Sequence, residues 1–123
     1  MIKIYGIKNC DSVKRAIRFC KAEGIEYMLY DFKEIAVDRS TIERWIESGA
    51  NIKQLFNARS STYRNLKLKD KNLNDSEKVD WLSRENMLIK RPVVELADGR
   101  VLVGYDEVLY RKHLVDFREI QEV

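Results

Sequence analysis

The sequence is poor in the residues that hold metal ions, form disulfide bonds or interrupt regular structure. Its 123 residues include two cysteines, one histidine, one proline and five glycines. A single histidine and two cysteines form no recognisable metal-ligand set, and we find no internal repeat, linker or low-complexity segment. The apolar runs are too short to span a bilayer, so no membrane association is expected.

The composition is that of one globular domain over residues 1–123. Hydrophobic residues make up 45% and charged residues 35%, the balance of a soluble protein with a normal core. The net charge of +3, with basic and acidic residues interleaved, does not indicate a nucleic-acid partner. The start, Met-Ile-Lys-Ile-Tyr, is strand-like and lacks a signal-peptide layout, so we expect a cytoplasmic protein with reduced thiols.

The first quarter of the chain has the pattern of a β-α-β unit. A strand at 2–6 is followed by a helix that Asp11 or Ser12 can cap and that Gly24 ends. A second strand is predicted at 25–32. A right-handed crossover makes the two strands parallel.

The rest of the chain first has the hydrophobic spacing of helices and then the alternation of strands. Residues 38–88 contain helical segments and no strand pattern. A hairpin follows, with strands at 91–96 and 100–105 around the turn signal Asp98-Gly99. Asp106 then caps a helix that runs to about His113, and residues 115–123 are expected to form a short amphipathic or frayed tail.

The order of these elements predicts the fold class. A parallel pair followed by an antiparallel hairpin and a closing helix is the layout of an α/β, thioredoxin-like protein. We therefore expect a mixed four-stranded sheet, with residues 38–88 as a helical insert between the second and third strands. Cys10 then falls in the loop between the first strand and the first helix, where this fold carries its chemistry.

Cys10 is the main candidate for chemistry. A reactive cysteine must be a thiolate near neutral pH, and the aligned N–H dipoles of a helix N-terminus favour the thiolate. Lys8, Lys14 and Arg15 add positive charge nearby, while Asp11 opposes it. Position and charge alone leave two alternatives open: a nucleophile, or a small, partly buried residue without reactivity.

Cys20 has a different position, on the apolar face of the same predicted helix. It recurs at helical spacing with Val13, Ala16 and Ile17, so we expect it in the core. Ten helical residues rise about 15 Å, whereas a disulfide needs Cα atoms within roughly 7 Å. Cys10 therefore cannot pair with Cys20 while the helix is folded, and an oxidised Cys10 must be resolved by an outside thiol.

Two arginines are candidates for holding an anion beside Cys10. Arg91 and Pro92 precede the third strand, whose start lies beside the cysteine loop in a thioredoxin-like fold. Arg91 can hold an oxyanion or a carboxylate by a bidentate contact, and Arg59 can enter the same pocket from the insert. The alternative for each arginine is a solvated surface residue. His113 stands alone near the end of the last helix, with little sign of a catalytic role.

Four blocks of the sequence together resemble a known family. In order they are "IYGIKNCDSVKRA", "LFNARSSTYRNLKL", "LIKRPVVEL" and "VLVGYDEVLY". They are similar to the arsenate reductase family in the broad sense, which includes Spx-type regulators and small thiol reductases of the YffB type. The resemblance runs from Met1 to about His113. It implies a thioredoxin-like fold, Cys10 as the catalytic cysteine, a cis bond between Arg91 and Pro92, and thiol chemistry coupled to glutathione or glutaredoxin.

Departures from the family pattern separate its branches. Where an arsenate reductase of this type has an arginine after the hairpin strand, this chain has Gly104. The insert arginine aligns nearer Asn57, with Arg59 two residues further on. The Cys-x-x-Cys switch of Spx-type regulators is absent, because Val13 stands at its fourth position, whereas "CDSV" resembles the YffB type.

These features together predict an oxidoreductase of the arsenate reductase family. We expect a glutathione-dependent thiol reductase with Cys10 as its single nucleophile, glutathione as co-substrate, and no bound cofactor or metal. The residues expected to bind glutathione or substrate are Asn9, Ser12, Arg59, Arg91 and Pro92. The alternatives are an arsenate reductase linked to glutathione or glutaredoxin, and a non-catalytic, Spx-like regulator that binds RNA polymerase.

Overall fold

The computed structural model describes residues 1–116 and forms a sheet covered by helices on both faces. Three short helical turns, named η1 to η3, supplement the α-helices. In chain order the elements are β1 (Ile2–Gly6), α1 (Asp11–Ala22), β2 (Tyr27–Asp31), α2 (Arg39–Glu47), α3 (Ile52–Leu55), α4 (Ser61–Asn65), η1 (Leu68–Lys71), α5 (Asp75–Arg84), η2 (Asn86–Leu88), β3 (Val93–Glu95), β4 (Val101–Val103), α6 (Glu107–Tyr110) and η3 (Arg111–Asp116).

The sheet has four strands in the order β2-β1-β3-β4. β1 is parallel to β2 and antiparallel to β3, and β3 and β4 form an antiparallel hairpin. This is the mixed sheet that the element order predicts, and the thioredoxin-like fold class is confirmed. The helices α2 to α5 lie between β2 and β3 in the sequence, within residues 38–88.

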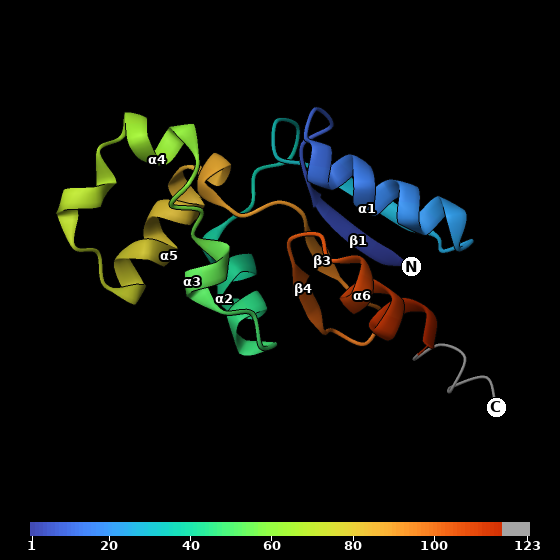
Figure 1. The fold of residues 1–123 in the computed structure, drawn as a ribbon. Coiled ribbons are helices and arrows are strands. Elements are labelled where there is room, and N and C mark those ends of the chain that lie inside the picture. The colour runs from blue at the N-terminus through green and yellow to red at the C-terminus, as the bar shows by residue number, and fades with distance from the viewer. Residues whose placement is uncertain (117–123) are drawn as a thin grey trace.

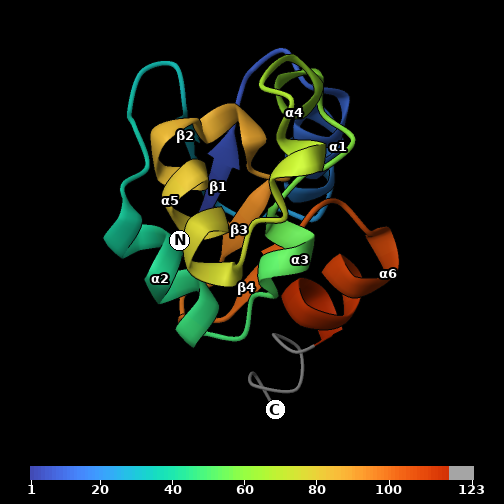
Figure 2. The same ribbon diagram turned by 90° about the vertical axis from the view of Figure 1, so that its left-hand side faces the viewer.

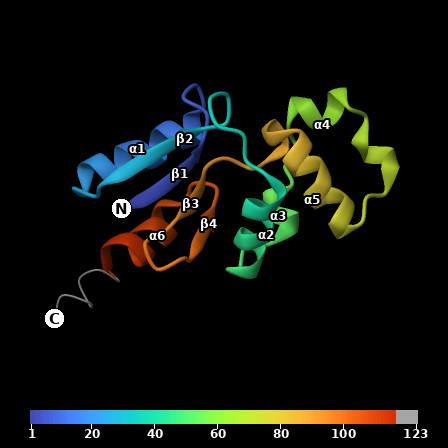
Figure 3. The ribbon, with the colours of Figure 1, turned by 180° about the vertical axis from the view of Figure 1, so that it is seen from behind.

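The two faces of the sheet carry different helices (Figure 1). α1 and α6 cover one face, and the helices of residues 38–88 lie beside the other, which Figure 2 shows from their side and Figure 3 from behind. Alternation along the strands explains this division, because successive side chains point to opposite faces. Ile4 and Val94 pack with the buried side of α1, whereas Tyr5 and Val93 pack with the insert.

A half-buried carboxylate joins the insert to the sheet. Glu95 of β3 accepts hydrogen bonds from the Tyr5 hydroxyl at 3.1 Å and from Trp45 Nε1 of α2 at 2.9 Å. Arg44 of α2 also donates to this carboxylate. Burial pushes the pKa of the Glu95 carboxyl up, but the donors outweigh it, and the net pKa is lower than usual.

Several predicted boundaries need correction. The helix cap predicted at Asp11 or Ser12 is wrong, because α1 already begins at Asp11 and its N-cap is Cys10. Packing of the helix against the sheet fixes where it starts and outweighs the capping preference of single side chains. The strands predicted at 25–32, 91–96 and 100–105 are shorter, as given above, because their end residues lie in the connecting turns.

The closing helix agrees with the prediction at its start. The Asp106 side chain accepts a hydrogen bond from the Leu109 backbone N–H at 3.2 Å and caps α6, which continues into the π-helical turn η3. Of the predicted tail at 115–123, residues 117–123 lie outside the part that the structure describes. Within residues 1–116, no helix is long and apolar enough to cross a membrane.

Candidate functional site around Cys10

Cys10 stands at the point where the chain leaves β1 and enters α1. Its backbone is extended, with φ −144° and ψ 124°, and its carbonyl accepts the Lys14 N–H at 2.9 Å. As the N-cap residue, it lies next to the first-turn N–H groups, which have no acceptor within the helix. Its half-buried side chain contacts the apolar clusters on both sides of the sheet. The thiol is therefore half-accessible at a helix N-terminus, beside backbone N–H groups.

Gly6 allows α1 to approach the sheet closely just before Cys10. A Cβ atom added at Gly6 would lie 2.6 Å from Cγ2 of Val13. Val13 is fully buried in the first turn of α1. Only glycine therefore permits this separation between the end of β1 and the helix that carries Cys10 at its start.

Asp31 holds the loop before Cys10, a role that we did not predict from the sequence. Its side chain is buried, with 6% relative exposure, at the end of β2. One carboxylate oxygen accepts the Lys8 backbone N–H at 3.3 Å and the other accepts the Lys33 backbone N–H at 2.8 Å. The available signal was an aspartate that ends the strand-like run "YMLYDF", where a buried charge needs hydrogen-bond partners.

Pro92 lies at the same end of the sheet as the Cys10 loop. Val93 pairs with Tyr5, and the Pro92 carbonyl accepts the Gly104 N–H at 2.7 Å. Pro92 is buried, and the peptide bond between Arg91 and Pro92 is cis, as the resemblance implies. The end of β1, the start of β3 and the end of β4 thus lie together at one end of the sheet.

Arg91 is held against the insert rather than extended into solvent. Its Nη1 donates to the carbonyls of Met87 at 2.9 Å and Ile89 at 3.4 Å. Its Nε is buried and has no hydrogen-bond partner among residues 1–116. A buried N–H without an acceptor is costly, so this atom is a candidate donor to a bound carboxylate or oxyanion.

The remaining predicted site residues occupy different places. Asn9 is exposed directly before Cys10, and Ser12 is half-buried in the first turn of α1. Arg59 is exposed and lines a cavity with Lys90 and Val103, and no contact joins it to Cys10 in the described structure. Asn9 and Ser12 are therefore next to Cys10 in the chain, whereas Arg59 lines a separate cavity.

Cys20 has none of the features of a reactive thiol. It is fully buried on the sheet side of α1, as the helical spacing predicts. Burial raises the pKa of its thiol to about 11. Both cysteines are free thiols, so only Cys10 combines access with a helix N-terminus.

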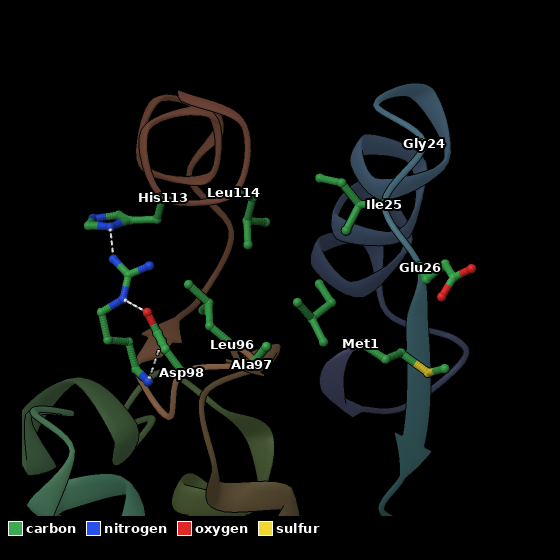
Figure 4. Close-up of a pocket in the computed structure, with 11 residues that line it drawn as sticks. Met1, Gly24, Ile25, Glu26, Leu96, Ala97, Asp98, His113 and Leu114 are labelled. Carbon is green, nitrogen blue, oxygen red and sulfur yellow. Dashed lines mark hydrogen bonds and ion pairs between the residues drawn. The ribbon is translucent and has the colours of Figure 1, made fainter. Parts of the chain in front are cut away.

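A second cavity of about 460 Å³ lies at the other end of the sheet, around Met1 and Leu96. Figure 4 shows Asp98 and His113 on one wall and Ile25 with Glu26 on the opposite wall. The Nδ1 atom of His113 is 2.8 Å from Nη1 of Arg100. Burial and the positive charge of Arg100 lower the pKa of His113. This cavity is remote from Cys10 along the strands.

Among the described residues, no three His, Cys, Asp or Glu side chains gather as a group that could hold a metal ion. A cysteine at the start of α1 and a cis proline at the start of β3, on a mixed sheet, define a thioredoxin-like protein. The chain belongs to the ArsC family, whose family model matches residues 5–113. The predicted membership of the arsenate reductase family in the broad sense is confirmed.

Similar proteins cover nearly the whole chain. A Haemophilus influenzae protein, itself uncharacterized, is 38% identical over 112 residues, which are 90% of this chain and 96% of the relative. The solved structure of the protein called YFFB has a TM-score of 0.85 and 29% identity, covering 94% of this chain and 100% of its own. A possible arsenate reductase from Streptococcus mutans has a TM-score of 0.72 and 33% identity, covering 85% of this chain and 91% of its own.

Proposed function

We propose that the protein is a glutathione-dependent thiol reductase in which Cys10 is the single nucleophile. The observation that supports this most is the contrast between the two cysteines. Cys10 is a half-buried N-cap residue beside free N–H groups, whereas Cys20 is fully buried inside the same helix. Because α1 separates them, the protein has no resolving cysteine of its own.

The reaction consists of two thiol-disulfide exchanges. The Cys10 thiolate attacks one sulfur of a substrate disulfide, an S–S bond forms to Cys10, and the other sulfur leaves as a thiolate that takes a proton from water. A glutathione thiolate then attacks the mixed disulfide and releases the Cys10 thiolate. Where the mixed disulfide already carries glutathione, the product is glutathione disulfide. In that case one glutathione thiol is oxidised and one substrate thiol is released, because the other sulfur of glutathione disulfide comes from the mixed disulfide. Where the mixed disulfide carries the substrate instead, a second glutathione thiolate attacks the resulting substrate–glutathione disulfide, so two glutathione thiols are oxidised and one substrate disulfide is reduced.

Groups around Cys10 have distinct parts in this proposal. The N–H groups at the start of α1 stabilise the thiolate as nucleophile and as leaving group. Arg91 offers its unpartnered Nε to a carboxylate of the bound peptide. Asn9 and Ser12 flank Cys10 in the chain, and Pro92 lies at the same end of the sheet, so these three are the contacts proposed for the peptide backbone.

The test is turnover of a mixed disulfide between glutathione and a small thiol, coupled to glutathione reductase. We expect Cys10→Ser to lower kcat/KM by about a thousandfold or more, because it removes the nucleophile. Cys20→Ser is the matched control and should retain turnover in whatever fraction remains folded, as circular dichroism reports. Full turnover by Cys10→Ser would overturn the proposal.

Two further assays separate the alternatives. Arsenate-dependent turnover with glutathione and glutaredoxin would identify an arsenate reductase. Because position 104 is a glycine, another residue would then have to supply the anion contact expected there from an arginine. A non-catalytic regulator would instead bind RNA polymerase equally well before and after Cys10→Ser. Under the proposal, arsenate turnover and such cysteine-independent binding are both absent.

A further inference from the structure

A cavity at the end of the sheet that carries Cys10 is lined by neutral and cationic residues. We name it the Lys90 pocket, after the residue that joins its two sides. It has a volume of about 480 Å³, and its walls include Lys53, Phe56, Asn57, Arg59, Lys90 and Val103. Three of its lining residues are cationic, and no carboxylate is among the described residues that line it. A small ligand with negative charge therefore fits it best.

The positions of these cations are set by backbone pairing between two distant segments. The Lys90 N–H donates to the Leu55 carbonyl at 2.8 Å, and the Asn57 N–H donates to the Leu88 carbonyl at 2.8 Å. Phe56 and Ile89, both buried, form the bridge between these bonds. The backbone from Leu55 to Asn57 is thereby fixed next to Lys90, and the three exposed cations line one pocket.

The side chain of Lys90 packs over Gly104. A Cβ atom at Gly104 would lie 3.5 Å from Cε of Lys90, so the lysine stem passes over a residue without a side chain. Gly104 also has φ +80°, a conformation that disfavours any larger residue. The side chain of Lys90 therefore passes beside the end of β4, where Val103 also lines the pocket.

The pocket and Cys10 belong to the same edge of the sheet. Gly104 donates its N–H to Pro92, and the next residue, Val93, pairs with Tyr5 at the end of β1. A ligand whose sulfur reaches Cys10 can therefore extend past Pro92 towards the Lys90 pocket. The apolar Phe56 and Val103 and a volume of this size suit a peptide better than a compact oxyanion, which would leave most of the space unfilled.

We propose that the Lys90 pocket binds a carboxylate of the small thiol peptide that reacts at Cys10, besides the one assigned above to Arg91. This inference rests on the proposed function for the identity of the peptide, a tripeptide with two carboxylates. Lys53, Arg59 and Lys90 then determine specificity, because they attract a doubly carboxylated thiol and not a neutral or cationic one. None of the three touches the reacting sulfur.

The experiment is an NMR titration of the full-length protein with S-methylglutathione, which binds as a peptide but has no free thiol. We expect amide shifts to change at Lys53, Arg59 and Lys90. The Lys53→Gln/Lys90→Gln variant should weaken binding by about tenfold. Lys21→Gln, an exposed lysine on α1, is the matched control for losing a charge and should leave binding unchanged. The dimethyl ester of S-methylglutathione should bind as weakly as the double variant.

Several results would overturn the inference, and they differ from a failure of the proposed function. Shift changes confined to the cavity of Figure 4 would contradict it, and so would equal losses in the double variant and in Lys21→Gln. Inorganic phosphate that occupies the pocket as tightly as S-methylglutathione would make it an oxyanion site instead. If Cys10 proves unreactive while S-methylglutathione still binds at Lys90, the proposed reaction fails and the binding site remains.

Discussion

The packing of α1 on β1 predicts a large effect for the smallest possible substitution, Gly6→Ala. The new Cβ would lie 2.6 Å from Cγ2 of Val13, and it would be 3.7 Å from the other two Val13 side-chain carbons. Carbon atoms in proteins do not approach to 2.6 Å, so either α1 or the end of β1 must shift. The shift occurs at the first turn of α1, immediately after Cys10.

Overpacking of this kind in a close-packed core costs about 1–3 kcal/mol. For a chain of this size, that corresponds to a fall in melting temperature of about 4–12 °C. Urea unfolding followed by the fluorescence of the two tryptophans, of which Trp45 is fully buried, measures the free energy of unfolding. Turnover should also fall in the folded fraction, because the helix N-terminus no longer sits correctly beside Cys10.

A double-mutant cycle tests the stated cause. Val13→Ala removes the Cγ2 atom and by itself costs roughly 2 kcal/mol as a cavity. In Gly6→Ala/Val13→Ala the clash is absent, so the double variant should be more stable than the sum of the two losses by about 0.5–3 kcal/mol. Unchanged stability in Gly6→Ala, or strict additivity in the cycle, would refute the argument that Gly6 sets the position of α1.

Three further predictions concern charged and buried groups. Glu95→Gln should lower the free energy of unfolding by about 1–3 kcal/mol. Because folding lowers the pKa of Glu95 from 4.5, the wild type keeps this stabilisation above that value and loses it as the pH falls through the folded pKa. Urea titrations at pH 2–6 should show this loss in the wild type and not in the variant. Folding raises the thiol pKa of Cys20 from 9.0 to about 11. The free energy of unfolding of the wild type should therefore fall by up to about 2.7 kcal/mol as the pH rises through this range. The stability of Cys20→Ala should fall less steeply, and parallel curves of stability against pH would contradict this. Asp31→Asn should lower kcat several-fold with little change in KM, because it leaves the Lys8 or Lys33 N–H without its acceptor and loosens the Cys10 loop; equal kcat values would exclude a positioning role.

The sequence pattern was sufficient for the fold because local signals and global topology agree. The β-α-β start, the Asp98-Gly99 turn and the cap at Asp106 each have a local chemical cause, and each occurs where predicted. The exact start of α1 was not predictable, because Cys10 is the N-cap for reasons of packing rather than capping chemistry. The predicted strands were too long, because strand ends depend on pairing between distant segments.

The candidate site was only partly accessible from the sequence. Cys10 and the pair Arg91-Pro92 follow from their places in the element order. Asp31 and Lys90 do not, because their roles depend on contacts across long sequence separations, from Asp31 to Lys8 and from Lys90 to Leu55. The cavity that Arg59 lines likewise includes two distant segments, which the isolated bridge between Phe56 and Ile89 brings together.

The central claim is that Cys10 alone exchanges with glutathione. The most direct measurement treats the folded protein with glutathione disulfide at pH 7 and locates the adduct by peptide mass spectrometry, before and after adding reduced glutathione. The account predicts a mixed disulfide on Cys10 that reduced glutathione removes, and none on the buried Cys20. An unmodified Cys10 under conditions that modify an unstructured cysteine peptide would contradict it.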